Sequence, residues 1–209
     1  GVLLVIDGHF LKLIATDGHR LAYIITKLDQ EYPKREIILP RKTVNELIKL
    51  LAETEEKITL ELAENQVRMT FSNIVLISKV IDGKFPDYER VIPNYTNQLT
   101  LNRIEILQAL QRAAILSNEK FRGVRFVLTE KNLRIISNNS EQEEAQEDME
   151  INYQGIALDV GFNVNYLMDG LNNATTQTVI FSFGDANSSI LITIPGNEEF
   201  KYVVMPMRI

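Results

Sequence analysis

The sequence predicts an α+β protein built from two copies of one unit, with antiparallel sheets. Three observations lead to this prediction: a pair of strand patterns that occurs twice, an apolar helical stripe that occurs twice, and a Val-x-Pro that closes each copy. Because self-similarity at a fixed period marks repeated architectures, we take the duplication as the organising feature of the chain.

The first repeated element is two short strands joined by a turn. Gly1–Ile6 matches Gly123–Leu128, and both are apolar runs rich in β-branched residues. The turn between the two strands is expected at Asp7-Gly8 in the first copy and at Lys131-Asn132 in the second. We therefore expect a pair of antiparallel strands at the start of both copies.

The second repeated element is a short amphipathic helix. Its apolar stripe is formed by Val44, Leu47, Ile48 and Leu51 in the first copy and by Val164, Leu167, Met168 and Leu171 in the second. Thr43 with Glu46 has the pattern of a capping box, and Asn163 is a suitable N-cap for the second helix.

Two strands are expected after each helix, at 58–62 and 66–71 and again at 179–183 and 189–194. The copies close with Val91-Ile92-Pro93 and Val204-Met205-Pro206. We therefore expect two domains, at 1–94 and 95–209, each a unit of roughly 120 residues in its complete form.

The second copy opens with a further helix at 102–117, for which Asn102 and Glu105 are capping residues. Gly1 already stands at the matching strand of the first copy, so we expect the sequence to be a fragment that starts part-way into a domain of a longer protein. On a helical wheel at about 100° per residue, the apolar face holds Ile106, Leu107, Leu110, Ala113 and Ala114. Ile115 and Leu116 fall outside this face, which indicates either a partner surface or burial under a local loop.

Composition limits the classes of function. The 209 residues are 45% hydrophobic and 24% charged, as is ordinary for a globular protein, and the absence of cysteine excludes disulfides and thiolate metal sites. The apolar runs are too short to span a bilayer, and no signal peptide is visible.

Charge is distributed unevenly along the chain. The formal net charge of −6, taken over the whole chain, argues against nucleic acid as a partner. However, residues 34–49 and 101–125 are rich in Lys and Arg, and residues 141–150 carry acidic side chains without a base. Different surfaces could therefore face different partners, although solvated faces explain the same pattern.

Four strings carry a specific resemblance. They are Ala15-Thr16-Asp17-Gly18-His19-Arg20-Leu21-Ala22, Asp82-Gly83-Lys84-Phe85-Pro86-Asp87-Tyr88, the segment Ala114 to Val124, and Tyr202-Val203-Val204-Met205-Pro206-Met207-Arg208. In this order they resemble the bacterial beta sliding clamp family, the DNA polymerase III beta subunit. The resemblance covers most of that family's second domain and all of its third, and the first domain is absent.

The resemblance implies tandem DNA-clamp domains, with antiparallel sheets outside and paired helices lining one concave face. It implies a cytoplasmic, non-catalytic processivity factor without a cofactor, metal or membrane partner. The family's full-length protein is a head-to-tail homodimer ring that encircles duplex DNA without regard to sequence and tethers the DNA polymerase III alpha subunit, the clamp-loader delta subunit, other polymerases and repair proteins. A chain without the first domain would then be a ring-incompetent monomer.

The resemblance also implies a pocket for short linear peptides. Carried onto this sequence, it would use Thr16, Gly18, His19, Arg20, Leu21, Pro86, Arg90, Val91, Phe121, Asn163, Tyr166, Ser189, Val203, Val204, Met205, Pro206, Met207 and Arg208. Flexible Met205 and Met207 suit several ligands, and the arginines suit acidic groups that flank a peptide. Asn187 and Glu89 depart from the family's usual residues, which affects peptide preference.

Two further surfaces are expected. Arg41, Lys42, Arg103 and Arg112 are the candidate DNA-facing cations, because loosely held long side chains suit phosphates without reading bases. The resemblance places the dimer interface at Ile115, Leu116, Glu141, Glu143 and Glu144.

Other interpretations of the same residues stay open. Asp17 and His19 could form a catalytic dyad, although no nucleophile stands in a recognisable motif and Asp17-Gly18 favours a turn. Asp82 and Asp87 could bind a metal, although a turn is the better interpretation. The rival functions are a peptide-binding adaptor with no DNA role and a hydrolase that uses His19.

Overall fold

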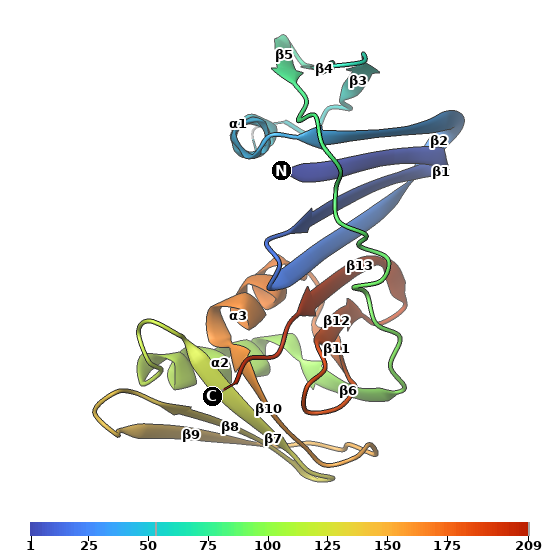
Figure 1. The fold of residues 1–209 in the computed structure, drawn as a ribbon. Helices are drawn as coiled ribbons and strands as arrows, with labels where there is room; N and C mark the ends of the chain where they lie inside the picture. The colour runs from blue at the N-terminus through green and yellow to red at the C-terminus, as the bar shows by residue number, and fades with distance from the viewer. Residues whose placement is uncertain (53, 209) are drawn as a thin grey trace. The chain divides into compact units, whose positions relative to one another are not determined.

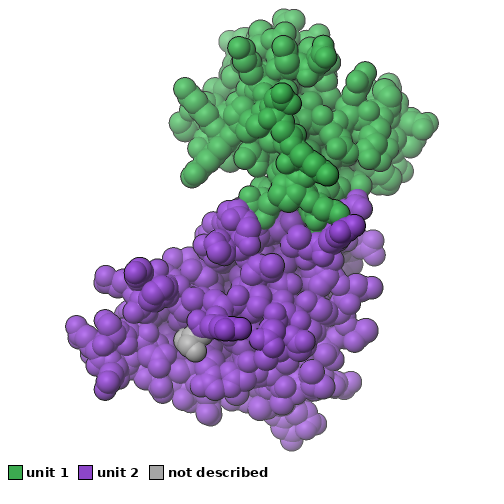
Figure 2. All heavy atoms as spheres, in the orientation of Figure 1, with its two compact units in different colours: residues 1–16, 23–88 green, residues 17–22, 89–209 purple. Residues whose placement is uncertain are grey.

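The computed structural model describes residues 1–52 and 54–208. The chain divides into two compact units (Figure 2): the first is formed by residues 1–16 and 23–88, the second by residues 17–22 and 89–209. The edge of the first unit lies a few residues before the domain boundary expected after residue 94. The short segment 17–22 leaves the first unit and belongs to the second.

The first unit is α+β. It contains β1 (Val2–Thr16), β2 (Arg20–Leu39, from residue 23 on), α1 (Arg41–Leu51), and the antiparallel strands β3 (Thr59–Leu62), β4 (Gln66–Phe71) and β5 (Ile74–Lys79) in the order β3-β4-β5. Its small core forms around Leu4, Leu39, Val67 and Met69.

Two strands were expected at the start of the first unit, but one continuous strand, β1, spans this region. Gly8 nevertheless has φ of 57°, a left-handed conformation that glycine adopts without a Cβ clash. The ribbons of β1 and β2 both double back (Figure 1). A turn as tight as this keeps strand hydrogen bonding on both sides, so β1 runs through it without a break.

The capping box predicted at Thr43 and Glu46 is wrong. Helix α1 begins earlier, after Pro40, and no side chain caps it. Thr43 lies inside the first turns and is buried, and its hydroxyl is 2.6 Å from that of Ser78 on β5. Pro40 is the N-cap, with φ of −61° and an extended ψ of 144°, and the helix begins directly after it, two residues ahead of the threonine.

The second unit contains two antiparallel sheets. One has the order β10-β7-β8-β9, from β7 (Gly123–Leu128), β8 (Asn132–Asn138), β9 (Glu144–Glu150) and β10 (Leu158–Asn163). The other includes β6 (Asn97–Asn102), β11 (Thr178–Phe183), β12 (Ile190–Ile194) and β13 (Asn197–Val204), in the order β13-β12-β11-β6. The strand, turn and strand expected from Gly123 are confirmed as β7 and β8.

Helices α2 (Arg103–Ile115) and α3 (Val164–Asn173) pack against each other in this unit (Figure 1). The N-caps predicted at Asn102 and Asn163 are confirmed, because each side-chain oxygen accepts hydrogen bonds from two backbone N–H groups of the first turn. Ile106, Leu107, Leu110 and Ala113 are buried as the wheel predicted, and Ala109 joins them, whereas Ala114 is only half-buried.

The core of the second unit lies between its helices and sheets. Aromatic rings fill much of it, and Phe126 and Phe162 meet edge to face with ring centroids 5.6 Å apart. The predicted fold class, α+β with antiparallel sheets, is therefore confirmed. Among the described residues no helix has both the length and the apolar character needed to cross a membrane.

Candidate functional site

The segment 17–22 begins with a tight turn organised by Asp17. Its Oδ1 accepts hydrogen bonds from the backbone N–H groups of His19 (3.0 Å) and Arg20 (3.1 Å). Gly18 has φ of 87°, which favours glycine at this position. The predicted Asp17-Gly18 turn is therefore confirmed, and it fixes the direction in which Arg20 leaves the backbone.

Arg20 is the centre of a polar cluster, which we call the Arg20 cluster and define as Asp17, Arg20, Tyr166, Asp169 and Tyr202. Its guanidinium donates to Asp17 (Nε to Oδ2, 3.1 Å), to Asp169 (2.5 Å) and to the Tyr202 hydroxyl (3.3 Å). The guanidinium carbon also lies 4.3 Å from the centroid of the Tyr166 ring. One side chain thus joins the segment 17–22 to α3 and β13 of the same unit.

The electrostatics keep this cluster charged. Burial lowers the pKa of Arg20, but hydrogen bonds to Asp169, Tyr202 and Asp17 raise it by more, so the net shift is upward. Burial raises the pKa of Asp17, and hydrogen bonds from the His19 and Arg20 backbone and from the Arg20 side chain overcome this and lower it. Burial raises the pKa of the Tyr202 hydroxyl, which therefore stays a neutral donor and acceptor.

Close packing on α3 positions Tyr202. A Cβ on Gly170 would lie 2.5 Å from the Tyr202 ring, so only glycine allows the ring to lie this close to the helix. Tyr202 is 7% exposed, and its position under α3 brings its hydroxyl to Arg20. Tertiary packing thus sets the geometry of the Arg20 cluster.

His19 and Tyr166 form an aromatic surface next to this cluster. Their rings are stacked with centroids 6.3 Å apart and an interplanar angle of 23°. Asn163 fixes the start of the helix that carries Tyr166, and its Nδ2 donates to the carbonyl of Phe121 (3.3 Å). Phe121 is 57% exposed, so its ring is available to a partner.

The C-terminal tail joins the same region. The N–H of Met205 donates to the carbonyl of His19 (2.8 Å), and the N–H of Met207 donates to the carbonyl of Gly161 (2.9 Å). Met205 is 42% exposed, whereas Val203 and Val204 are fully buried in β13. The two valines can therefore pack beneath this surface, but their side chains cannot contact a ligand.

Other predicted pocket residues are less closely tied to this region. Ile190 pairs with Val204, so the preceding residue, Ser189, lies at the same end of the sheet as Met205. Arg90 and Arg208 are exposed, and Val91 is half-buried. Thr16 and Pro86 belong to the first unit and Leu21 to the second, where it is buried.

The geometry does not support a catalytic dyad at Asp17 and His19. Both carboxylate oxygens of Asp17 accept hydrogen bonds from the backbone or from Arg20. The His19 ring stacks on Tyr166. Within residues 1–52 and 54–208, no three His, Cys, Asp or Glu side chains lie close enough together to hold a metal ion, and Asp82 and Asp87 belong to no such group.

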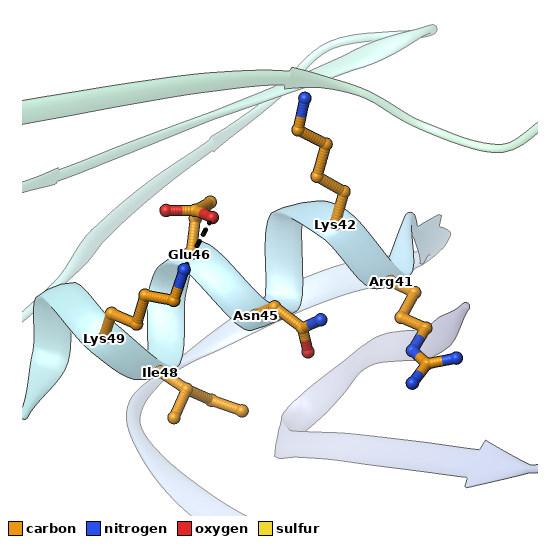
Figure 3. A pocket seen from close by; sticks show the side chains of 6 residues that line it. All are labelled: Arg41, Lys42, Asn45, Glu46, Ile48 and Lys49. Atoms are coloured by element: carbon orange, nitrogen blue, oxygen red, sulfur yellow. Dashed lines mark hydrogen bonds and ion pairs between the residues drawn. The ribbon is translucent and has the colours of Figure 1, made fainter.

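Two of the predicted DNA-facing cations lie on α1. Arg41, Lys42, Asn45, Glu46, Ile48 and Lys49 line a shallow hollow of about 500 Å³ on this helix (Figure 3). Lys49 is paired with Glu46 at 3.1 Å, while Arg41 and Lys42 are exposed. Lys49, which the sequence argument did not select, adds a third cation to this helix.

The other two predicted cations have partners inside the second unit. Arg103 donates to the carbonyls of Thr176 (2.7 Å) and Leu171 (3.3 Å), at the C-terminal end of α3. Arg112 makes a bidentate pair with Glu147 at 2.9 and 2.7 Å, which raises the pKa of Arg112 and lowers that of Glu147. Neither guanidinium is as available to phosphate as the prediction of a loosely held cation required.

The predicted dimer residues lie in two places, at the end of α2 and around the start of β9. Ile115 is 76% exposed, so burial under a local loop is excluded for it, and Leu116 is half-buried. The Ser137 hydroxyl donates to the carbonyl of Ala113 (2.6 Å), which brings the β8–β9 turn to this helix end. That turn carries the exposed Glu141 and Glu143, and the exposed Glu144 is the first residue of β9.

Asp169 and Tyr202 are the residues that sequence reasoning missed. Asp169 follows Tyr166 by three positions, so both lie on one face of α3, which is a signal that a helical wheel of this segment contains. Tyr202 stood inside a recognised string, but only the packing at Gly170 brings its hydroxyl to Arg20.

Comparison with known proteins agrees with this architecture. Residues 1–87 match the family model described as DNA polymerase III beta subunit, central domain, and residues 89–208 match that of its C-terminal domain. The chain belongs to the DNA polymerase III beta subunit family. The resemblance seen in the sequence is therefore confirmed.

Individual relatives of the family are similar over the whole chain. The beta sliding clamp of Vibrio cholerae is 44% identical over 210 residues, and that of Escherichia coli is 40% identical. A crystal structure of the DNA polymerase III subunit beta from Pseudomonas aeruginosa superposes with a TM-score of 0.96 at 42% identity, covering all of this chain and 58% of that one. The chain spans 57% of the length of the two curated relatives.

Proposed function

We propose that these residues form two of the domains of a DNA sliding clamp, which encircles duplex DNA and tethers replication and repair proteins by short peptide tails. In this proposal the clamp slides because its contacts with phosphate are electrostatic and independent of sequence. Tethering raises the effective concentration of a polymerase at its template. The processivity factor itself catalyses no reaction.

One observation carries the peptide-binding part of the proposal. Residues from four distant parts of the chain form one surface: His19 and Arg20, Phe121, Tyr166, and Met205 with Met207. The exposed Phe121 and Met205, with the half-buried Tyr166 and Met207, suit a short peptide that has apolar anchors, and the exposed Arg90 and Arg208 suit an acidic group on that peptide. Thr16, Pro86, Arg90, Val91, Ser189 and Arg208 remain part of the proposed site on the strength of the family resemblance.

The DNA-facing part of the proposal is carried by α1. Arg41, Lys42 and Lys49 present three cations on one short helix, although Glu46 offsets part of the charge (Figure 3). Flexible cations of this kind contact phosphates without reading base edges. Arg103 and Arg112 act mainly within the fold in this proposal, as the cap of α3 and the partner of Glu147.

Assembly follows the family pattern in the proposal. The full-length protein is a cytoplasmic homodimer ring, with sheets outside and helices lining the hole, and Ile115 with the acidic β8–β9 turn lies at its dimer interface. The proposed peptide partners are the polymerase III alpha and clamp-loader delta subunits, other polymerases and repair proteins. The 209-residue chain by itself is expected to sediment as a monomer, because the other half of that interface belongs to a domain outside these residues.

Titration of a fluorescent peptide tests the binding surface. The probe is a short peptide with two leucines, a phenylalanine and one aspartate, and the readout is fluorescence anisotropy. We expect saturable binding that weakens at least tenfold when Met205 and Met207 are both replaced by alanine, because each removed side chain gives up apolar contact of about 1 kcal/mol or more.

A matched control separates this surface from general damage to the protein. Val75→Ala removes an exposed aliphatic side chain (49% exposed) from β5 in the first unit and should leave the affinity unchanged. Equal binding by the methionine variant and the Val75→Ala variant would remove the assignment of the peptide site.

A DNA experiment distinguishes the clamp from an adaptor with no DNA role. The full-length protein is loaded onto nicked circular DNA, which is then cut once, and the complex is followed by gel filtration. A clamp stays with the circle and leaves the linear DNA, because topology and not affinity retains it. Release at the same rate from both forms would leave the adaptor as the better proposal.

A further inference from the structure

Three elements of the second unit supply side chains to the proposed peptide surface. His19 stands in the segment 17–22, Tyr166 on α3, and Met205 directly after β13. The Arg20 cluster takes its members from the same three elements. The cluster therefore lies where the positions of these elements relative to one another are set.

Contacts of two kinds hold the segment that carries His19 and Arg20 to the other two elements. The N–H of Met205 donates to the carbonyl of His19 (2.8 Å), so the tail is held by the backbone. The Arg20 guanidinium donates to Asp169 on α3 (2.5 Å) and lies 4.3 Å from the centroid of the Tyr166 ring. The spacing between the segment and α3 therefore depends on side chains, and a substitution can change it without breaking the link to the tail.

Asp169 is placed to control the direction of the Arg20 guanidinium. It follows Tyr166 by three positions, so both side chains lie on one face of α3. A hydrogen bond between two charged groups is about twice as strong as one between neutral groups, and this one holds the cation at the Tyr166 ring. The Tyr166 ring stacks on the His19 ring, with centroids 6.3 Å apart. A continuous series of contacts thus leads from the Asp169 carboxylate to the two rings of the peptide surface.

We propose that Asp169 is a positioning residue of the peptide surface. It fixes Arg20, Arg20 fixes the spacing of the His19 and Tyr166 rings, and that spacing determines how tightly the apolar anchors of a peptide are bound. Rings that are already held by packing and hydrogen bonds lose less freedom when a ligand binds, so binding is tighter. This role rests on the proposed peptide-binding function of the second unit. The Asp169 carboxylate itself does not touch the peptide.

Peptide affinity tests the role of Asp169. Asp169→Asn keeps the shape of the side chain and removes the charge that holds the guanidinium. With the fluorescent peptide of two leucines, a phenylalanine and one aspartate, we expect Asp169→Asn to weaken binding about fivefold, the scale of one half-exposed ion pair. Asp159→Asn is the matched control, because Asp159 on β10 is also about half exposed (49%, against 55% for Asp169) and pairs with Arg125 in the same unit. The control should leave the affinity unchanged.

Two comparisons separate positioning from direct contact. In chains that carry Arg20→Met, Asp169→Asn should have no further effect on affinity, because its route to the rings is already broken. A peptide in which asparagine replaces the aspartate should show the same fold-change between the unaltered chain and Asp169→Asn as the acidic peptide does. An effect of Asp169→Asn that persists without Arg20, or that depends on the charge of the peptide, would overturn the proposal in favour of direct contact.

The chain without peptide gives a spectroscopic readout of the ring geometry. It has two histidines, so the Hε1 protons of the imidazoles give two NMR signals, and His9→Gln assigns them. Stacking on Tyr166 shifts the His19 signal through the ring current of the tyrosine. Asp169→Asn should move this signal, while Asp159→Asn leaves it in place.

The outcomes distinguish this inference from the proposed function. If the peptide binds to none of the chains, the peptide surface itself is removed and this inference with it. If the peptide binds equally to the unaltered chain and to Asp169→Asn, or if the His19 signal does not move, the positioning role alone is overturned.

Discussion

Replacing Arg20 with methionine tests how far one side chain holds together the proposed peptide surface of the second unit. The substitution keeps the apolar stem and removes the guanidinium, which contacts Asp17, Asp169 and Tyr202 and covers the Tyr166 ring. The loss is therefore confined to hydrogen bonding and charge. The same change should loosen the segment 17–22, because Arg20 supplies its ion pair with α3 and the loss of this pair leaves the stacking of His19 on Tyr166 to hold it.

The contacts set the size of the effect. The Tyr202 hydroxyl is buried, so removing its donor costs about 1–3 kcal/mol, and the lost cation–π contact adds about 0.5–1 kcal/mol. Asp17 and Asp169 are about half exposed (45% and 55%), so their ion pairs contribute at most about 1 kcal/mol each. We expect Arg20→Met to destabilise the second unit by about 1.5–6 kcal/mol in total.

A double-mutant cycle isolates the buried part of this cost. Tyr202→Phe removes the hydroxyl that Arg20→Met leaves without its donor, so the double variant should be less destabilised than the sum of the single variants by about 1 kcal/mol. Because the chain has two compact units, hydrogen exchange measured by mass spectrometry is a better assay than a single unfolding curve. Segments 17–22 and 164–173 report the effect, and β4 in the first unit is the internal control.

Two results would refute this account. Full additivity of the two substitutions would show that Arg20 and Tyr202 do not interact. Unchanged exchange in 17–22 after Arg20→Met would show that the tail contact between Met205 and His19 is sufficient to hold the segment, without the guanidinium.

Three further substitutions have defined outcomes. Tyr153 is fully buried, and its hydroxyl has no hydrogen-bond partner among the described residues. Tyr153→Phe should therefore stabilise the second unit by up to about 1–3 kcal/mol and raise its Tm. A lower Tm would show that the hydroxyl is hydrogen-bonded. Gly170→Ala gains about 1 kcal/mol of helix propensity, but the clash of the new Cβ with the Tyr202 ring costs more. Both the Tm of the second unit and its peptide affinity should therefore fall. A higher Tm would contradict the packing argument. Hydrogen bonds from Asn132, Gln146 and Arg134 lower the pKa of Asp148 to about 2. A carboxyl whose pKa is lower in the folded than in the unfolded protein stabilises the fold when the pH is above its unfolded pKa. The contribution of Asp148 to the free energy of unfolding should therefore be complete above about pH 4 and disappear as the pH falls towards 2. Asp148→Asn should flatten that acid limb, and an unchanged limb would exclude Asp148 as its source.

Much of the fold could be predicted from periodicity. The apolar stripe of α3, the Asn102 and Asn163 caps and the β7–β8 turn all depend on neighbours within a few residues, and the structure agrees with each. The stripe predicted on α1 is only partly confirmed, because Ile48 is 65% exposed and Val44, Leu47 and Leu51 are half-buried. The capping box at Thr43 failed because Pro40 offered an earlier helix start and Ser78, distant in sequence, offered the threonine another partner. Local patterns do not contain such competing contacts.

The candidate site divides in the same way. The resemblance selected His19, Tyr166 and the methionines, and the structure brings them together in one unit. The partners of Arg103 and Arg112 could not be predicted, since each arginine is paired with a group more than thirty positions away. A helical wheel shows that a cation lies on the outer face of a helix, but it cannot show whether a carbonyl or a carboxylate from another element lies within hydrogen-bond distance of it.

By itself, the sequence determined that the chain is duplicated, which family it resembles and which residues are apolar on each helix and strand, because these properties are written in local order and spacing. Only the tertiary structure decided that Arg20 would be held by Asp169 and Tyr202, that Arg103 would be bonded to backbone carbonyls, and that Arg112 would be paired with Glu147. These outcomes depend on distances between residues that are far apart along the chain, and such distances are set only when helices and sheets pack.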